Sequence, residues 1–146
     1  MSLKDWAANG WLKAHTTSKQ EIIDLFAAVD RDRADATKGL SDDWKFNIAY
    51  NAARGLCTAL LYAAGYRADR DGNHFYTIGA LKHILGTDAG DLPRLLEVCR
   101  KKRNTATYES IGLVSAREAE DLLNAVDELR AKVVAWFKSN HPKLLP

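Results

Sequence analysis

Apolar residues recur along much of this chain at steps of three and four, the spacing that places them on one face of an α-helix. The pattern is clearest in the segment 116–140, where the apolar positions are Ala119, Leu122, Val126, Leu129, Val133 and Trp136. The segment 19–38 has a similar face, formed by Ile22, Leu25, Phe26 and Val29. Both segments are therefore predicted to be amphipathic helices that bury one side.

The segment 42–64 has a different pattern, because it is apolar on nearly every side. Between Phe46 and Ala64 the apolar run is interrupted by four polar side chains, those of Asn47, Asn51, Arg54 and Thr58. A helix that is apolar all round belongs in the middle of a bundle, where other helices cover each of its faces. We therefore expect this segment to be the central helix.

Residues typical of helix starts and ends divide the rest of the chain. Ser18 and Ser115 are each followed three residues later by a glutamate, which is the spacing of a capping box. Ser41 precedes two aspartates, whose charge is favourable at the start of a helix. Glycines that suit a left-handed helix end follow three of the runs, at Gly39, Gly65 and Gly86. These signals delimit helices over about 3–14, 19–38, 42–64, 75–104 with a break near 86–91, and 116–140.

The connections between these segments are mostly short, which favours antiparallel neighbours. No segment alternates strictly between apolar and polar residues, so no strand is predicted. The sequence thus predicts an all-α fold, an antiparallel up-and-down bundle of four to five helices. We expect one domain over 1–146, with a short N-terminal helix at about 3–14 and the core bundle at about 18–141. A chain of 146 residues can bury an adequate core without disulfides.

Composition and motifs remove several functional classes. Cys57 and Cys99, the two cysteines, lie among apolar residues, which favours buried thiols over a disulfide or a metal site. No apolar run approaches the ~20 residues of a membrane-spanning helix, and no export signal is visible, so a cytoplasmic location is expected.

The glycine motifs of hydrolases and nucleotide-binding folds are missing, and no histidine pair has the spacing of metal ligands. We expect no cofactor and no metal. His74 lies where a loop leads into a helix, and capping is its expected role.

The densest basic stretch is formed by residues 100–103, which are Arg-Lys-Lys-Arg. Four cations at the end of a helix stabilise its negative pole, so a solvated helix end is one interpretation. The other is an anion site, because arginine makes two-pronged contacts with phosphate. If the helix continues, Arg100, Asn104 and Tyr108 lie on one face, at positions i, i+4 and i+8. The net charge of +2 does not decide between these interpretations.

A second polar feature is the pair Asn47 and Asn51 on the predicted central helix, with Lys45, Tyr50 and Arg54 around it. A buried amide without a partner costs about 1–3 kcal/mol, so each must find a hydrogen bond. One interpretation is internal bonding to neighbouring helices. The other is that this polar stripe completes a pocket together with the segment around Arg103.

Several stretches, taken in their order along the chain, resemble small bacterial HEPN-domain proteins. They are DWKFNIAYNAA at 43–53, AGYR at 64–67, HFY at 74–76, RKKRN at 100–104, YE at 108–109, VSxxEAE at 114–120, Trp136 and His141-Pro142. The resemblance covers most of the chain from about residue 19. It implies a bundle of four or five helices that pairs into a homodimer. Many members are metal-independent endoribonucleases of bacterial toxin–antitoxin or defence systems, often beside a nucleotidyltransferase or antitoxin partner.

Nucleases of this family carry an arginine and a histidine with four to six residues between them, often with a polar residue directly after the arginine. Arg103-Asn104 matches the opening of that motif, and Tyr108 stands where the histidine would be. A tyrosine, with an ordinary pKa near 10, is a poor general base compared with histidine. The resemblance therefore implies a site of Arg103, Asn104 and Tyr108, assisted by Arg100, Asn51, Asn47 and Lys45, that is suited to holding an RNA-like anion. Whether such a site cleaves RNA stays open.

Two functional hypotheses follow from these observations. In the first, the chain binds RNA or a nucleotide phosphate and is the toxin-like, ribonuclease-related component of a two-gene system. In the second, it is a non-catalytic dimeric interaction module that acts with a partner encoded nearby. The basic stretch and the polar stripe favour the first hypothesis, whereas the missing histidine favours the second.

Overall fold

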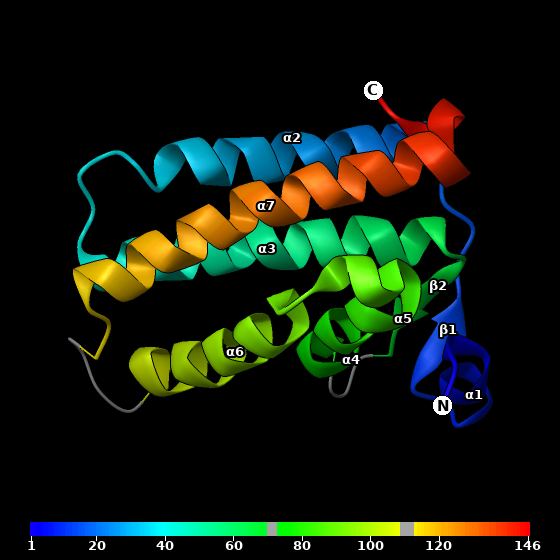
Figure 1. Cartoon of the computed structure of the whole chain (residues 1–146), viewed down its shortest axis with the longest axis horizontal. Coiled ribbons are helices and arrows are strands. Elements are labelled where there is room, and N and C mark those ends of the chain that lie inside the picture. Colours follow the sequence, from blue (N-terminus) through cyan, green and yellow to red (C-terminus); the bar gives the residue numbers. More distant parts are fainter. Residues whose placement is uncertain (70–72, 109–112) are drawn as a thin grey trace.

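The protein is mostly helical, with a small two-stranded sheet at one end (Figure 1). The computed structural model describes residues 1–69, 73–108 and 113–146, and only the backbone of 105–108. The elements in chain order are α1 (Leu3–Ala8), β1 (Leu12–Ala14), α2 (Lys19–Asp35), α3 (Asp42–Ala63), β2 (Tyr66–Ala68), α4 (Asn73–Gly79), α5 (Leu81–Leu85), η1 (Gly86–Ala89), α6 (Leu92–Tyr108), α7 (Ala116–Asn140) and η2 (Pro142–Leu144). The expectation of a helical bundle is confirmed.

Four long helices form the bundle, and successive ones run in opposite directions (Figure 1). The helix α3 lies at its centre and contacts α2, α4, α6 and α7. Its side chains are buried on several sides, and Ala49, Tyr50, Leu56 and Leu60 have no exposed surface. The nearly continuous apolar run of this segment thus matches its central position, as the sequence predicted. Cys57 and Cys99 are buried free thiols, as expected.

Serine caps begin three of the long helices at the predicted positions. The hydroxyl oxygens of Ser18, Ser41 and Ser115 each accept a hydrogen bond from the backbone N–H three residues later. The glutamate after Ser115 completes the capping box by accepting from the serine N–H. The glutamate after Ser18, Glu21, instead contacts His15 and Thr17, so the hydroxyl alone caps α2.

The strands correct the prediction that the chain has none. The predicted N-terminal helix over 3–14 ends at Ala8, and β1 pairs antiparallel with β2, with Leu12 opposite Ala68. Gly10, with a φ of 80°, makes the turn between α1 and β1. Each strand has three residues, which is too short for an alternating pattern to appear. The helix predicted to start at about residue 75 begins at Asn73, as α4.

The helices α2 and α3 approach each other closely at Gly55. A Cβ atom at that position would lie 2.8 Å from the Cγ2 atom of Val29, closer than side chains tolerate. The helices α2 and α7 also meet, with the rings of Phe26 and Phe137 packed edge to face. Within the described residues, no helix is both long enough and apolar enough to cross a membrane.

Candidate functional site

Arg103 lies on α6 and points toward α3. Its Nε atom donates a hydrogen bond to the Oδ1 atom of Asn47 over 3.2 Å, and its guanidinium carbon lies 5.5 Å from the centre of the Tyr50 ring. The side chain of Arg103 is half-buried, and that of Tyr50 is fully buried. The guanidinium therefore belongs to a packed site between two helices.

His74, the second residue of α4, lies in the same place. Its Nδ1 atom is 3.3 Å from the Tyr50 hydroxyl, and its Nε2 atom is hydrogen-bonded to the Nη1 atom of Arg54. Because a guanidinium only donates, Nε2 must be the acceptor. The ring proton is then on Nδ1 and points to the Tyr50 oxygen. These two neighbours thus select one neutral tautomer of the imidazole.

We name these five residues, Asn47, Tyr50, Arg54, His74 and Arg103, the α3–α4–α6 cluster. Burial, followed by the nearby charges of Arg54, Arg103 and Arg100, lowers the pKa of His74 to about 4. Burial raises the pKa of Tyr50 to about 12, although the same arginines oppose that shift. At neutral pH the cluster therefore contains a neutral imidazole, a protonated phenol and two cationic guanidiniums.

The two arginines of the cluster have neutral partners. Arg54 bonds to His74, and Arg103 bonds to Asn47. Within the described part of the chain, neither forms an ion pair with a carboxylate, whereas Arg100 pairs with Glu97 at 2.7 Å. Arg100 also lies over the Phe75 ring, with its guanidinium carbon 5.4 Å from the ring centre. Among the described residues, these two half-buried positive charges thus have no carboxylate partner.

A groove of about 450 Å³ adjoins the cluster. It is lined by residues from α2 and α3 and by the first residue of α4. Arg54 lines this groove and also contacts His74, so the groove leads directly to the cluster. Asn51 lies one turn before Gly55 on the same wall.

The structure brings some of the predicted site residues together and separates others. Arg103 and Asn47 are in contact, and Asn51 lies in the adjoining groove. Lys45 instead forms an ion pair with Glu120 of α7, at 2.9 Å, and Asn104 is exposed. The helix continues through Tyr108, but the side chain of Tyr108 lies outside the described residues.

Sequence reasoning missed the role of His74, which was expected to cap a helix. The structure places its ring against α3, where both ring nitrogens have hydrogen-bond partners. A signal was present in the spacing of Tyr50 and Arg54. They lie four residues apart on a helix that is otherwise mostly apolar, so their polar atoms require a partner from another element.

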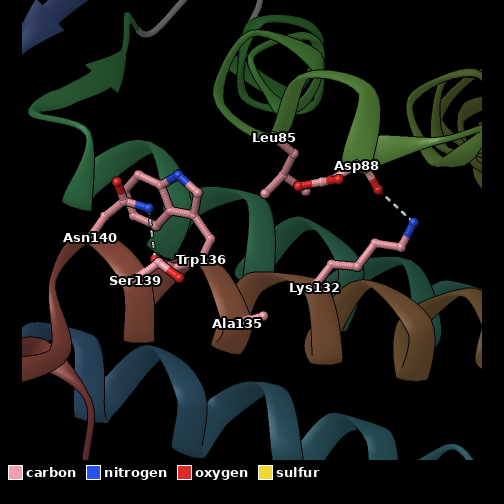
Figure 2. A pocket seen from close by; sticks show the side chains of 7 residues that line it. All are labelled: Leu85, Asp88, Lys132, Ala135, Trp136, Ser139 and Asn140. Carbon is pink, nitrogen blue, oxygen red and sulfur yellow. Dashed lines mark hydrogen bonds between the residues drawn. The ribbon is translucent and has the colours of Figure 1, made fainter.

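Another pocket, between η1 and the end of α7, suits an anion less well (Figure 2). Its volume is about 370 Å³, and Trp136 and Asn140 line one end. Its one lining cation, Lys132, is bonded to the Asp88 carbonyl oxygen at 2.5 Å and lies 3.4 Å from Glu128. Within residues 1–69, 73–108 and 113–146, no group of three or more His, Cys, Asp or Glu is placed to hold a metal ion.

Comparisons with protein-family models, with curated proteins and with solved structures find no match to this chain. The candidate site is therefore defined by its own geometry. That geometry is a pair of uncompensated guanidiniums beside a neutral imidazole, next to a polar groove.

Proposed function

We propose that this chain binds the phosphate of RNA or of a nucleotide at the α3–α4–α6 cluster. The observation that supports this most strongly is the presence of two half-buried guanidiniums, those of Arg54 and Arg103, whose partners are neutral. Removing a charge from water costs free energy unless an opposite charge compensates it. A bound anion would supply that compensation at both side chains.

Phosphate is the anion that we assign to this site. Each guanidinium can donate two parallel hydrogen bonds, and a phosphodiester offers oxygens to both donors at once. The neutral amide of Asn47 and the protonated phenol of Tyr50 repel no anion. Of the other cations in the segment 100–103, Arg100 pairs with Glu97 and Lys102 pairs with Glu118, so the charge offered to an anion is mainly that of the two cluster arginines. RNA is the substrate class that the resemblance to HEPN-domain proteins implies.

The test is binding of a fluorescently labelled single-stranded RNA at low salt by the parent protein and by Arg103→Gln. Arg33→Gln is the matched control, because Arg33 pairs with Asp127 on another face of the bundle. We expect Arg103→Gln to weaken binding at least about tenfold, the effect of one charged hydrogen bond. The slope of log K against log salt is expected to fall by about 0.7, the value for one phosphate contact on a single strand. Equal binding by all three proteins, each with the parent helical signal, would contradict the proposal.

RNA cleavage is a second candidate, favoured by the neutral His74. A phosphate that draws Arg54 to itself would release the Nε2 lone pair, which could then accept the proton of a 2′-hydroxyl. As the 2′-oxygen bonds to phosphorus, the bond to the 5′-oxygen breaks and that oxygen takes a proton from water. The products are a 2′,3′-cyclic phosphate and a 5′-hydroxyl. Arg103 would stabilise the charge that develops on the phosphate oxygens.

The cleavage hypothesis is tested with RNA and with the same strand methylated at its 2′-oxygens, in the presence of a chelator. We expect fragments with cyclic phosphate ends from RNA alone, and none from His74→Asn although this variant still binds. If RNA binds and no fragments form, the phosphate-binding proposal stands and the cleavage hypothesis is rejected.

The alternative of a dimeric interaction module is supported by exposed apolar side chains. Trp44 and Val98 are 63% and 58% exposed. Val98 also lines a small groove between α6 and α7 whose walls include Phe46 and Leu95. This hypothesis expects a homodimer that Trp44→Ser or Val98→Ser converts to monomer, measured by sedimentation. A parent protein that is monomeric at high concentration would contradict it.

A further inference from the structure

We infer that the groove between α2 and α3 holds the nucleoside attached to the bound phosphate, with an amino-bearing base, adenine foremost, beside Asn51 and Asp32. This inference rests on the proposed phosphate site. Its starting point is Arg54, which lines the groove and also bonds to His74 in the α3–α4–α6 cluster. A phosphate held at Arg54 would therefore lie against the wall of the groove.

The groove has the size and lining of a small-ligand site. Its volume of about 450 Å³ lies within the 300–1,000 Å³ typical of such sites. The α2 wall is apolar at Leu25, Ala28 and Val29 and charged at Arg31 and Asp32. The opposite wall is the polar stripe of α3, which includes Asn51 and Thr58. An apolar wall facing hydrogen-bonding groups suits a flat ring with polar edges.

Asn51 is the residue best placed to recognise such an edge. Its side chain is half-buried, and within the described residues its amide makes no hydrogen bond. By contrast, the Thr58 hydroxyl is already used, since it donates to the Arg54 carbonyl at 2.8 Å. A carboxamide offers a donor beside an acceptor, the complement of the N6 and N7 positions of adenine.

The groove also has a carboxylate on its α2 side. Asp32 lines the groove together with Arg31, whose Nη2 atom is 3.1 Å from the Asp32 Oδ1 atom, whereas Arg54 lines it from α3 and contacts the cluster. A carboxylate repels a second phosphate and accepts hydrogen bonds from an exocyclic amino group. The phosphate is thus directed to Arg54 and the base toward Asp32. Uracil has no amino group and gains less from this arrangement.

The test compares the dissociation constants of four probes by calorimetry: AMP, UMP, ribose 5-phosphate and inorganic phosphate. We expect AMP to bind at least about tenfold more tightly than ribose 5-phosphate, and UMP to lie between them. In Asn51→Leu the advantage of AMP over ribose 5-phosphate should disappear. Asn124→Leu, the same change at an exposed position of α7, should retain that advantage. Asp32→Asn should reduce the difference between AMP and UMP, and it tests the groove without altering Asn51.

The outcomes separate this inference from the proposal on which it rests. Equal affinity for AMP and ribose 5-phosphate, with both weakened by Arg103→Gln, would overturn the nucleoside groove and leave the phosphate site standing. An AMP advantage that persists in both Asn51→Leu and Asp32→Asn would also overturn the groove. Failure of every probe to bind would overturn both.

Discussion

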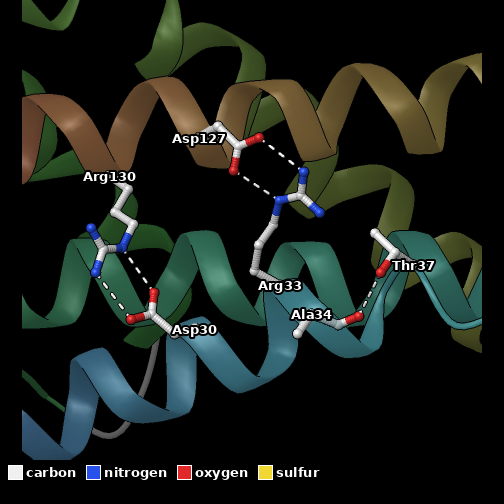
Figure 3. Close-up of polar contacts among 6 residues, drawn as sticks. All are labelled: Asp30, Arg33, Ala34, Thr37, Asp127 and Arg130. Carbon is white, nitrogen blue, oxygen red and sulfur yellow. Dashed lines mark hydrogen bonds and ion pairs between the residues drawn. The ribbon is translucent and has the colours of Figure 1, made fainter.

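Arginines occur at two helix interfaces of this molecule with opposite kinds of partner. Between α2 and α7, Arg33 holds Asp127 with two hydrogen bonds of 2.8 and 2.9 Å (Figure 3). In the same interface Arg130 holds Asp30 at 2.8 and 3.0 Å. In the α3–α4–α6 cluster the partners of the arginines are an imidazole and an amide. The first pair of arginines joins two helices, whereas the second is the pair that we propose binds phosphate.

The ionisable neighbours respond differently at the two interfaces. The hydrogen bond from Arg33 lowers the pKa of Asp127 below its ordinary value, so this carboxylate stays charged and cancels the arginine. In the cluster, burial and then the arginine charges lower the pKa of His74. The ring therefore stays neutral and does not balance the charge of either arginine. Burial and sequence composition alone do not distinguish the two pairs of arginines, whereas the charge of their partners does.

The largest expected difference concerns RNA binding by two double variants. Arg54→Gln combined with Arg103→Gln removes both uncompensated charges and should weaken binding at least about 100-fold, since hydrogen bonds to charged groups contribute about 1.5–3 kcal/mol each. Arg33→Gln combined with Arg130→Gln removes two charges as well and should change binding by less than about threefold. Titration of labelled RNA at fixed low salt measures both. A similar loss in the two proteins would mean that net charge alone governs binding.

Stability should respond in the opposite order. Arg33→Met breaks a two-pronged pair on a partly exposed surface and should lower the free energy of unfolding by about 0.5–1 kcal/mol. Arg103→Met removes a half-buried charge that lacks a counter-ion and should leave the free energy of unfolding unchanged or slightly higher. Urea denaturation followed by circular dichroism measures both changes. Strong destabilisation by Arg103→Met, beyond about 2 kcal/mol, would show that Arg103 is a packing residue.

The smallest expected effect is a pH dependence specific to the cluster. Because the folded-state pKa of His74 is lowered from 6.5 to about 4, the unfolded chain binds more protons between these values. Stability should therefore fall as the pH drops from 7 toward 4. The loss should be under about 1 kcal/mol, because water screens this partly exposed ring.

The matched comparison for that effect is the parent protein against His74→Asn, unfolded with urea at pH 7.5 and at pH 5. The parent should lose more stability than the variant over this interval. The Arg33–Asp127 pair should not contribute, because Asp127, with a pKa below 3.8, stays ionised at both values. Identical losses in the parent and in His74→Asn would mean that the imidazole titrates normally.

The sequence predicted the long helices well because their boundaries carry local signals. Ser41 and Ser115 begin helices where the caps indicated, and the nearly all-apolar run of α3 reflects the helices packed around it, which are α2, α4, α5, α6 and α7. The strands were missed because each is three residues long and its partner lies more than fifty residues away. Pairing of that kind leaves no pattern within either segment.

The sequence indicated several residues of the candidate site, but it did not indicate which of them contact one another. Arg103 and Asn47 were named from the basic stretch and the polar stripe, and they are in contact. The amide and phenol around this guanidinium come from Asn47 and Tyr50 of α3, whereas the segment after Arg103 was expected to supply them. Nothing local indicates that the start of α4 packs on α3, so His74 was interpreted by its position in its own segment.

The small sheet pairs residues 12–14 with residues 66–68, shortly before the chain reaches His74. The Asp69 N–H donates to the Trp11 carbonyl, and the His15 N–H donates to the Gly65 carbonyl, which extends the pairing beyond both strands. β2 ends five residues before Asn73, so pairing with the first fifteen residues fixes the position of the chain just before the helix that contains His74. Substitutions near Trp11 are therefore expected to change phosphate binding at the proposed site by displacing the start of α4, although Trp11 itself lies outside the cluster.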